Sequence, residues 1–256
     1  MRFGVCAGID KAAILADAGY DYIELSAAGD LIPDSNEVAW DKKRHAILAL
    51  PLPVEAFNSF VRTGKIVGPE ADPARLEQYV HTCLARAGEV GGKIVVFGSG
   101  GARNVPDGYE RAAAQADLLR FLTFCADASD ETGVVVVIEP LNRSESNILN
   151  TVHEGAQLAR MVNRAGVRNL ADTYHMEKDG ESLSAIIADA DVLAHVHTAD
   201  TNRLAPGTGT YDHRAFFAAL KQANYDARVS IEGGWGDFVK EAPAALAHLR
   251  HATTAV

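Results

Sequence analysis

Four residues with metal-binding side chains each stand at the end of a short apolar run of this chain. They are Glu139 after VVVVI, Asp172 after VRNLA, His197 after VLAHV and Glu232 after RVSI. A charged side chain that is buried alone loses its hydration, which is costly. Four such placements in succession are best explained if the four side chains converge on one cation. The sequence therefore predicts a metal site.

The residue types indicate which metal this site would take. Three carboxylates and one imidazole form a hard, oxygen-rich ligand set. Such a set favours Mn²⁺ most, with Mg²⁺, Co²⁺ or Zn²⁺ as acceptable substitutes, over a metal that requires thiolates. Each residue taken alone could instead cap a neighbouring loop, but the four together favour a divalent cation.

Short β-rich runs alternate with longer amphipathic segments along the chain. The expected strands cover residues 3–6, 22–25, 54–57, 94–97, 134–138, 169–171, 193–197 and 229–232, and helical patterns cover residues 74–90, 109–132 and 154–166. In the second helical pattern, Leu118, Phe121 and Leu122 recur at the helical period. Gly92, Gly133 and Gly166 fall just before strands, where we expect helix C-caps and turns.

This alternation predicts an α/β fold, a single (β/α)8 TIM barrel with residues 1–256 as one domain. Strands that are apolar on both faces, such as VVVVI, fit a sheet covered by helices outside and filled by side chains inside. A doubly wound sheet is the competing fold, but GVCAGID after the first strand is not a dinucleotide-binding fingerprint. Barrel active sites lie at the C-terminal ends of the strands, where the four predicted ligands stand.

Charge and cysteine content narrow the partners and the location. A net charge of −10 argues against nucleic acid or an anionic membrane as the main partner. The three cysteines are far apart and form no disulfide framework, as is typical of a reducing cytosol. The start, MRFGVCAGIDK, shows no apolar h-region of the kind that a signal peptide has, and no apolar run approaches the roughly 20 residues that span a bilayer. We therefore expect a cytoplasmic enzyme that acts on a small molecule, with exterior helices that could support a homo-oligomer.

Several segments resemble the signatures of one family. IEPLNRSESN, ADTYHM, HVHTADTNRLAPGTG and SIEGG are similar to motifs of the xylose isomerase-like TIM-barrel superfamily. Within it, the chain most resembles sugar (phosphate) isomerases and epimerases of the tagatose/psicose 3-epimerase and hydroxypyruvate isomerase group. The resemblance implies that the metal ligands are Glu139, Asp172, His197 and Glu232, and that the substrate contacts are Glu145, His175 and Arg203. Two departures leave the substrate open: Ala199-Asp200 replaces the usual Gly-Glu pair, and the segment NSFVRTGKIVGPEADP differs from the family.

The implied reaction is a proton transfer on a ketose, a ketose phosphate or a small hydroxy-keto compound. A metal bound to two adjacent sugar oxygens acidifies the C–H between them and stabilises a cis-enediolate. Glu139 and Glu232 are the expected catalytic residues, one removing the proton and the other returning it. Return to the opposite face gives epimerisation, and return to the neighbouring carbon gives isomerisation. Arg203 and His175 would stabilise the oxygen on which negative charge develops.

Three other functions remain open on the same scaffold. A lyase or dehydratase acting on a keto-sugar or inosose would keep the metal and the fold. An AP-endonuclease-like metal hydrolase would need more zinc ligands and a basic groove, which the charge of −10 disfavours. A sugar-binding barrel without activity would be indicated by loss of a catalytic glutamate, yet Glu139 and Glu232 are both present.

Four further residues are candidates for the site or its surroundings. Arg103 lies in the glycine-rich loop 98–109, which could hold a phosphate or could simply be a tight turn. His195 shares a strand face with His197, and we expect it lower in the barrel, hydrogen-bonded in the core. Glu24 and Trp235 are expected to line the pocket, or else to pack only.

Overall fold

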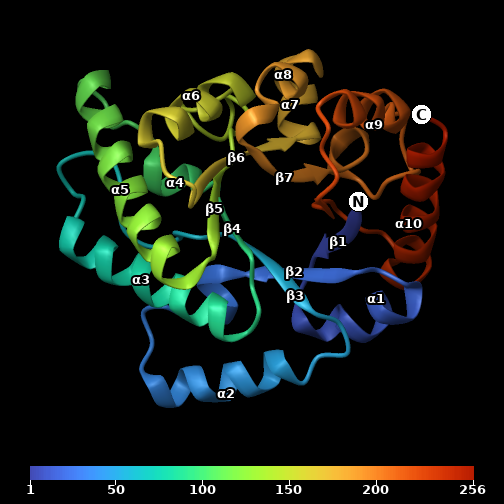
Figure 1. Cartoon of the computed structure of the whole chain (residues 1–256), viewed down its shortest axis with the longest axis horizontal. Helices are drawn as coiled ribbons and strands as arrows, with labels where there is room; N and C mark the ends of the chain where they lie inside the picture. The colour runs from blue at the N-terminus through green and yellow to red at the C-terminus, as the bar shows by residue number, and fades with distance from the viewer.

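The computed structural model describes residues 1–256, and its eight parallel strands close into a barrel in chain order (Figure 1). The strands are β1 (Arg2–Cys6), β2 (Tyr22–Ser26), β3 (Val54–Asn58), β4 (Ile94–Phe97), β5 (Val135–Ile138), β6 (Val167–Asp172), β7 (Leu193–Thr198) and β8 (Arg228–Ile231). The barrel closes because β1 pairs with both β2 and β8. The predicted (β/α)8 TIM barrel is confirmed.

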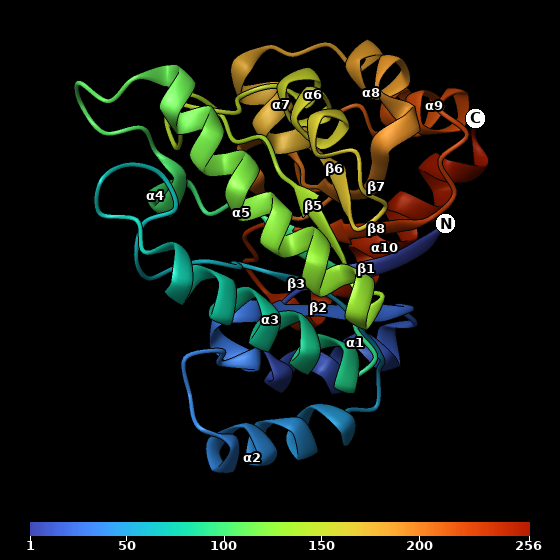
Figure 2. The ribbon, with the colours of Figure 1, turned by 60° about the vertical axis from the view of Figure 1, so that its left-hand side comes forward.

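Helices surround the strands. The longer ones are α1 (Ala12–Ala18), α2 (Glu37–Leu48), α3 (Pro73–Glu89), α5 (Arg111–Thr132), α6 (Val152–Val162), α9 (His213–Gln222) and α10 (Phe238–Thr254). Three short helices, α4 (Gly100–Arg103), α7 (Thr173–Asp179) and α8 (Ser184–Ala188), lie in the loops after β4, β6 and α7. Figure 2 shows α3 and α5 running side by side along one side of the barrel. None of the helices has the length and apolarity needed to cross a membrane.

Polar side chains fix where several helices begin. Asn36, Asp72, Thr151, Asp212 and Asp237 each accept a hydrogen bond from the backbone N–H three residues further on. These bonds satisfy amides that have no partner within the first turn of a helix. The N-termini of α2, α3, α6, α9 and α10 are stabilised in this way.

Two hydrophobic clusters lie on the two faces of the barrel wall. The larger comprises 61 buried residues between strands and helices, and it includes the Phe97–Phe121 contact of β4 with α5. The smaller, inside the barrel, comprises Tyr22, Ala56, Ile94, Val96, Val137 and Leu170. Alternate residues of β4 belong to different clusters, as expected when both faces of a strand are buried.

The glycines before the strands serve two different purposes. Gly133 ends α5 with φ of 72°, so the predicted C-cap is confirmed there. The C-cap prediction is wrong for Gly92 and Gly166. A Cβ on Gly166 would lie 2.2 Å from Ser129 Oγ, and one on Gly92 would lie 2.7 Å from the Phe57 ring. These two positions require glycine because the neighbouring element packs too closely for a side chain.

Candidate metal centre and active site

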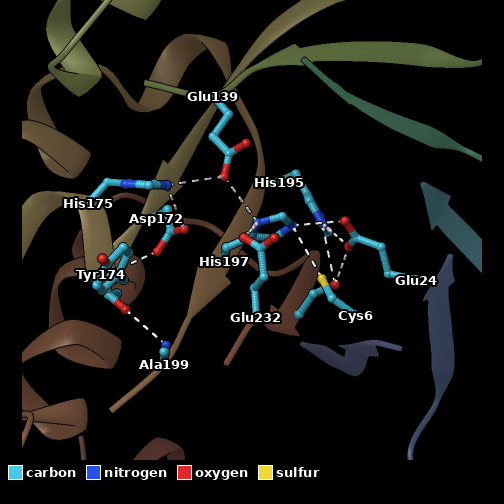
Figure 3. A network of polar contacts seen from close by, with 12 residues as sticks. Cys6, Glu24, Glu139, Asp172, Tyr174, His175, His195, His197, Ala199 and Glu232 are labelled. Atoms are coloured by element: carbon cyan, nitrogen blue, oxygen red, sulfur yellow. Dashed lines mark hydrogen bonds and ion pairs between the residues drawn. The ribbon is translucent and has the colours of Figure 1, made fainter. Parts of the chain in front are cut away.

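Four side chains converge at the C-terminal ends of β5, β6, β7 and β8 (Figure 3). Glu139 directly follows β5, Asp172 ends β6, His197 is the penultimate residue of β7 and Glu232 directly follows β8. The strand register places Asp172 beside His197. One ligand atom from each of the four residues lies within 4.8 Å of the others. The structure therefore brings together all four residues that the sequence singled out as ligands.

Two oxygens of this cluster have no hydrogen-bond partner. They are Glu139 Oε1 and Asp172 Oδ2, and both residues are buried. Buried polar atoms in folded proteins almost always have a partner. A divalent cation would satisfy both oxygens, and three carboxylates with one imidazole match the ligands that such cations take. The residues present therefore fit a divalent metal.

The imidazole of His197 is held between two sets of carboxylates. Its Nδ1 lies 3.1 Å from Glu232 Oε2 and 3.4 Å from Glu139 Oε1. Its Nε2 lies 3.0 Å from Glu24 Oε1 on the opposite side of the ring. An ionised carboxylate only accepts hydrogen bonds, so Nε2 carries a proton toward Glu24. Nδ1 is the ring atom directed at the cluster.

Burial and neighbouring charges shift the pKa values of this cluster in opposite directions. Burial raises the pKa of Asp172 to about 6; His175 opposes this shift, and Glu232 and Glu139 add to it. Burial also disfavours the charged form of Glu232, but His197 and Arg203 outweigh it and lower the pKa to about 2. Glu232 is therefore ionised at neutral pH and available to bind a cation or accept a proton.

His175 projects into the same cluster from α7. Its Nδ1 lies 3.2 Å from the backbone nitrogen of Asn142 and 2.8 Å from the side-chain amide of the same residue. Because the backbone N–H donates to Nδ1, the ring proton is on Nε2, which faces Asp172 at 3.6 Å and Glu139 at 3.9 Å. The Asn142 amide also donates to Glu145 Oε1 at 2.9 Å. Asn142 orients two predicted substrate contacts, and its place in EPLN directly after β5 is the only sequence signal for that role.

Arg203 reaches the cluster from the loop after β7. One terminal nitrogen lies 3.0 Å from Glu232 Oε2, and the other lies 3.9 Å from Glu145 Oε1. The guanidinium also stacks over the Tyr174 ring, 4.6 Å from its centroid. No residue pattern pointed to Tyr174, which lies between Asp172 and His175 in the chain.

A cavity of about 530 Å³ opens above these residues. Glu139 and Glu232 line its floor together with His175, Glu145 and Arg203. A further wall is formed by residues 98–102 after β4 and, at the end of β3, by Asn58, Ser59, Val61 and Arg62. Three of its lining residues have left-handed backbone: Ser59 with φ of 52°, Ser99 with 47° and Arg203 with 61°. Non-glycine residues rarely adopt this conformation, and such strain is concentrated at functional sites. The cavity is the candidate substrate pocket.

Comparison with known proteins identifies the family of the chain. A family model described as xylose isomerase-like TIM barrel matches residues 12–252. The chain belongs to this family. The resemblance expected from the sequence motifs is confirmed.

Several relatives within the xylose isomerase-like family are sugar epimerases. The L-ribulose 3-epimerase of Methylomonas sp. (strain DH-1) is 32% identical over 237 residues, which cover 88% of this chain and 78% of that protein. The D-psicose 3-epimerase of Agrobacterium fabrum is 35% identical over 108 residues, or 42% of this chain and 37% of that protein. The crystal structure of the 3-keto-D-glucoside 4-epimerase from E. coli matches with a TM-score of 0.82 and 25% identity, covering 98% and 99% of the two chains. These relatives support the prediction of an isomerase or epimerase.

The sequence left open whether the loop with Arg103 holds a phosphate or is a tight turn, and the structure rules out Arg103 as a phosphate ligand in the pocket. This xylose isomerase-like barrel buries the Arg103 side chain completely. Its guanidinium donates to the backbone carbonyls of Phe97, Glu139 and Leu149, at 2.8 to 3.2 Å. It joins the loops after β4 and β5 and does not line the cavity. Arg62 is the arginine on that wall of the pocket, and the sequence did not single it out.

The remaining candidates lie below or beside the pocket. His195 is completely buried with Nε2 2.9 Å from Glu24 Oε2, so the prediction of a hydrogen-bonded residue lower in the barrel is confirmed. Glu24 does not line the pocket but lies completely buried beneath the cluster (Figure 3). Trp235 also does not line it, and its ring packs on Phe238 with 4.8 Å between centroids.

Proposed function

We propose that this chain is a divalent-metal-dependent isomerase or epimerase of a ketose or a small hydroxy-keto compound. The observation that carries the proposal is the pairing of Glu139 and Glu232. Both line the floor of the pocket, and both lie within 3.4 Å of His197 Nδ1. Two carboxylates around one reacting carbon can remove a proton and return it. The sugar epimerases among the relatives support this reaction class.

The metal would be held by four residues, Glu139, Asp172, His197 and Glu232. This ligand set favours Mn²⁺, with Mg²⁺, Co²⁺ or Zn²⁺ as substitutes. When bound there, the cation supplies Lewis-acid polarisation of the substrate carbonyl, which acidifies the adjacent C–H. Asp172 and His197 serve only as ligands.

We also propose that residues 1–256 act as one domain in the cytoplasm, supported by three cysteines that form no disulfide.

The chain's own groups would carry the proton steps. One of Glu139 and Glu232 removes the proton from carbon, and the other delivers a proton to the opposite face in epimerisation. His175 Nε2–H and the Arg203 guanidinium stabilise the oxygen that becomes negative. Glu145, held by Asn142, accepts a hydrogen bond from a substrate hydroxyl. Arg203 contacts both Glu232 and Glu145, so it would link the proton-transfer group to the substrate contact.

Deuterium incorporation tests this function and locates the reacting carbon. The protein is incubated with Mn²⁺ in D₂O and a panel of ketoses, ketose phosphates, 3-keto-glucosides and hydroxypyruvate. An isomerase or epimerase leaves deuterium at one carbon of its substrate, and NMR identifies that carbon. A product that has lost water would instead assign the dehydratase alternative, and no incorporation into any compound would contradict the proposal.

Removal of either carboxylate should strongly lower turnover at saturating Mn²⁺. Glu139→Gln and Glu232→Gln are each expected to lower the epimerisation rate about 100- to 10,000-fold, the usual contribution of general acid–base catalysis. Glu131→Gln is the control, because Glu131 is an exposed residue on α5, outside the barrel. If both site variants kept near-normal turnover and C–H exchange, the two-glutamate scheme would be wrong.

A further inference from the structure

A polar network lies inside the barrel directly beneath the cluster (Figure 3). Glu24 and Tyr22 come from β2, His195 from β7 and Ser230 from β8, and all four are completely buried. The proton transfers proposed above use none of these residues. The network meets the cluster at His197, whose Nε2 also lies 4.0 Å from Cys6 Sγ.

Glu24 is the centre of this network. Its Oε1 lies 3.0 Å from His197 Nε2, and its Oε2 lies 2.9 Å from His195 Nε2. Ser230 Oγ donates to Oε2 at 2.6 Å and lies 2.7 Å from the Tyr22 hydroxyl. Because Ser230 uses its proton on Glu24, the Tyr22 hydroxyl donates to Ser230. Both carboxylate oxygens are thus engaged, and their donors come from strands β7 and β8.

Stability alone does not account for this arrangement. A buried carboxylate is costly to desolvate, and apolar residues of similar volume often give equal or greater stability than a buried charged network. The network is also incomplete as a hydrogen-bonding unit, because His195 Nδ1 has no partner. The network contacts the metal cluster through His197 and so fixes the orientation of that imidazole.

We infer that Glu24 is a positioning residue that fixes His197 for metal binding, with His195 and Ser230 holding Glu24 in place. Glu24 accepts a hydrogen bond from Nε2–H, which turns Nδ1 toward Glu139 and Glu232, where it would become the ligand atom once a cation displaces its own proton. This inference rests on the metal site of the proposed function. Partners of this kind typically contribute about 10- to 100-fold in metal affinity.

The test is titration of the metal-free protein with Mn²⁺ alone. Glu24→Gln keeps the shape of the side chain but removes the charge and one acceptor. We expect the Mn²⁺ affinity of the folded protein to fall about 10- to 100-fold, whatever the change in the urea midpoint of the metal-free protein. A purely structural role would lower that midpoint and leave the affinity of the folded molecules unchanged.

A matched control separates this effect from the loss of any buried carboxylate. Asp117 on α5 is buried and accepts hydrogen bonds from the Gly68 amide and the Tyr109 hydroxyl, outside the barrel. Asp117→Asn should leave Mn²⁺ affinity unchanged. If Glu24→Gln does not fold, Glu24→Asp is tested in its place. The shorter carboxylate keeps the charge but cannot reach both histidines, so the Mn²⁺ affinity of this variant should also fall.

A second readout follows the proton itself. In zinc-loaded protein with ¹⁵N-labelled histidine, we expect one zinc-bound ring to show a protected Nε2 proton, which Glu24→Gln makes exchange faster. Wild-type affinity in both Glu24 variants would overturn the inference. Binding of two Mn²⁺ per chain would also overturn it, if the second ion displaced the Nε2 proton of His197 and bound between that nitrogen and Glu24. Failure of the proposed epimerisation gives a different pattern, since Mn²⁺ would still bind and still depend on Glu24 without deuterium exchange on any sugar.

Discussion

At the residue level, the position of the Glu139 carboxylate depends on the absence of a side chain at Gly98. Gly98 follows β4, beside the loop that carries Glu139. A Cβ on Gly98 would lie 2.2 Å from Glu139 Oε2 and 3.5 Å from Leu141. The first distance is a clash with the end of a flexible side chain, and the second is ordinary contact. The fold can therefore accept alanine at position 98, but the carboxylate cannot stay where it is.

Gly98→Ala should impair catalysis without unfolding the protein. We expect a loss on the order of 100-fold in turnover, because a displacement of about 1 Å in a catalytic group has that effect. Mn²⁺ affinity should fall as well. Gly101→Ala is the control for affinity, because a Cβ there meets no atom within 4 Å. Steady-state kinetics, calorimetry with Mn²⁺ and a urea titration measure the three quantities, and unchanged kinetics in Gly98→Ala would show that Glu139 can shift freely.

At the level of elements, one carboxylate organises the loop that carries Arg203. Asp200 is buried and accepts hydrogen bonds from the amides of Thr201, Gly207 and Tyr211, at 2.7 to 2.9 Å. Burial opposes its charge, but these amides outweigh burial and lower the pKa of Asp200 to about 2. The departure from the Gly-Glu pair of ketose 3-epimerases thus contains a residue that shapes the loop.

Asp200→Asn should destabilise the protein by about 1–3 kcal/mol at pH 7, the usual value of hydrogen bonds to a charged group. The folded-state pKa lies below the unfolded one, so the contribution of Asp200 is complete above about pH 4 and is lost as the pH falls toward 2. Urea titrations at pH 7 and pH 3 should show the difference between wild type and variant shrinking in acid. Asp107→Asn, at an exposed aspartate of the loop after β4, should show no such difference.

The sequence predicted the strands and the residues at their ends, but not the direction of each side chain. Period-two alternation reveals which residues face inward only when one face is polar, and most strands here are apolar on both. Arg103 therefore could not be distinguished from a pocket residue, although its side chain joins two loops internally. Glu24 had the same ambiguity, because its partners come from strands more than 170 positions away. The helix end at Val162 was missed because Asn163 adopts the left-handed conformation expected of Gly166.

At the level of the whole molecule, the closed barrel brings three carboxylates together in a buried site. The side chains that face these carboxylates as partners are two histidines, His175 and His197, and one arginine, Arg203. A bound cation should therefore stabilise the entire fold, since a ligand that binds only the folded state shifts the unfolding equilibrium.

Removal of metal should lower the thermal midpoint. Mn²⁺ at about 100 times its dissociation constant adds about 2.7 kcal/mol, equivalent to about 5–10 °C for a protein of this size. Calorimetric scans with Mn²⁺ and with EDTA measure the shift, and NaCl at equal ionic strength is the control. Asp172→Asn should show a smaller shift, and an equal midpoint with and without Mn²⁺ would contradict the metal site.

The proposed reactive groups and one wall of the cavity come from different parts of the barrel, so the two can change independently in evolution. The proposed ligands follow β5 to β8, whereas the wall formed by residues 58, 59, 61, 62 and 98–102 lies at the ends of β3 and β4. Substitutions in these two short loops can therefore change the substrate specificity while the residues that follow β5 to β8 stay the same. A designer can follow the same route if the grafted loop keeps glycine at position 98, because any side chain there would displace the Glu139 carboxylate.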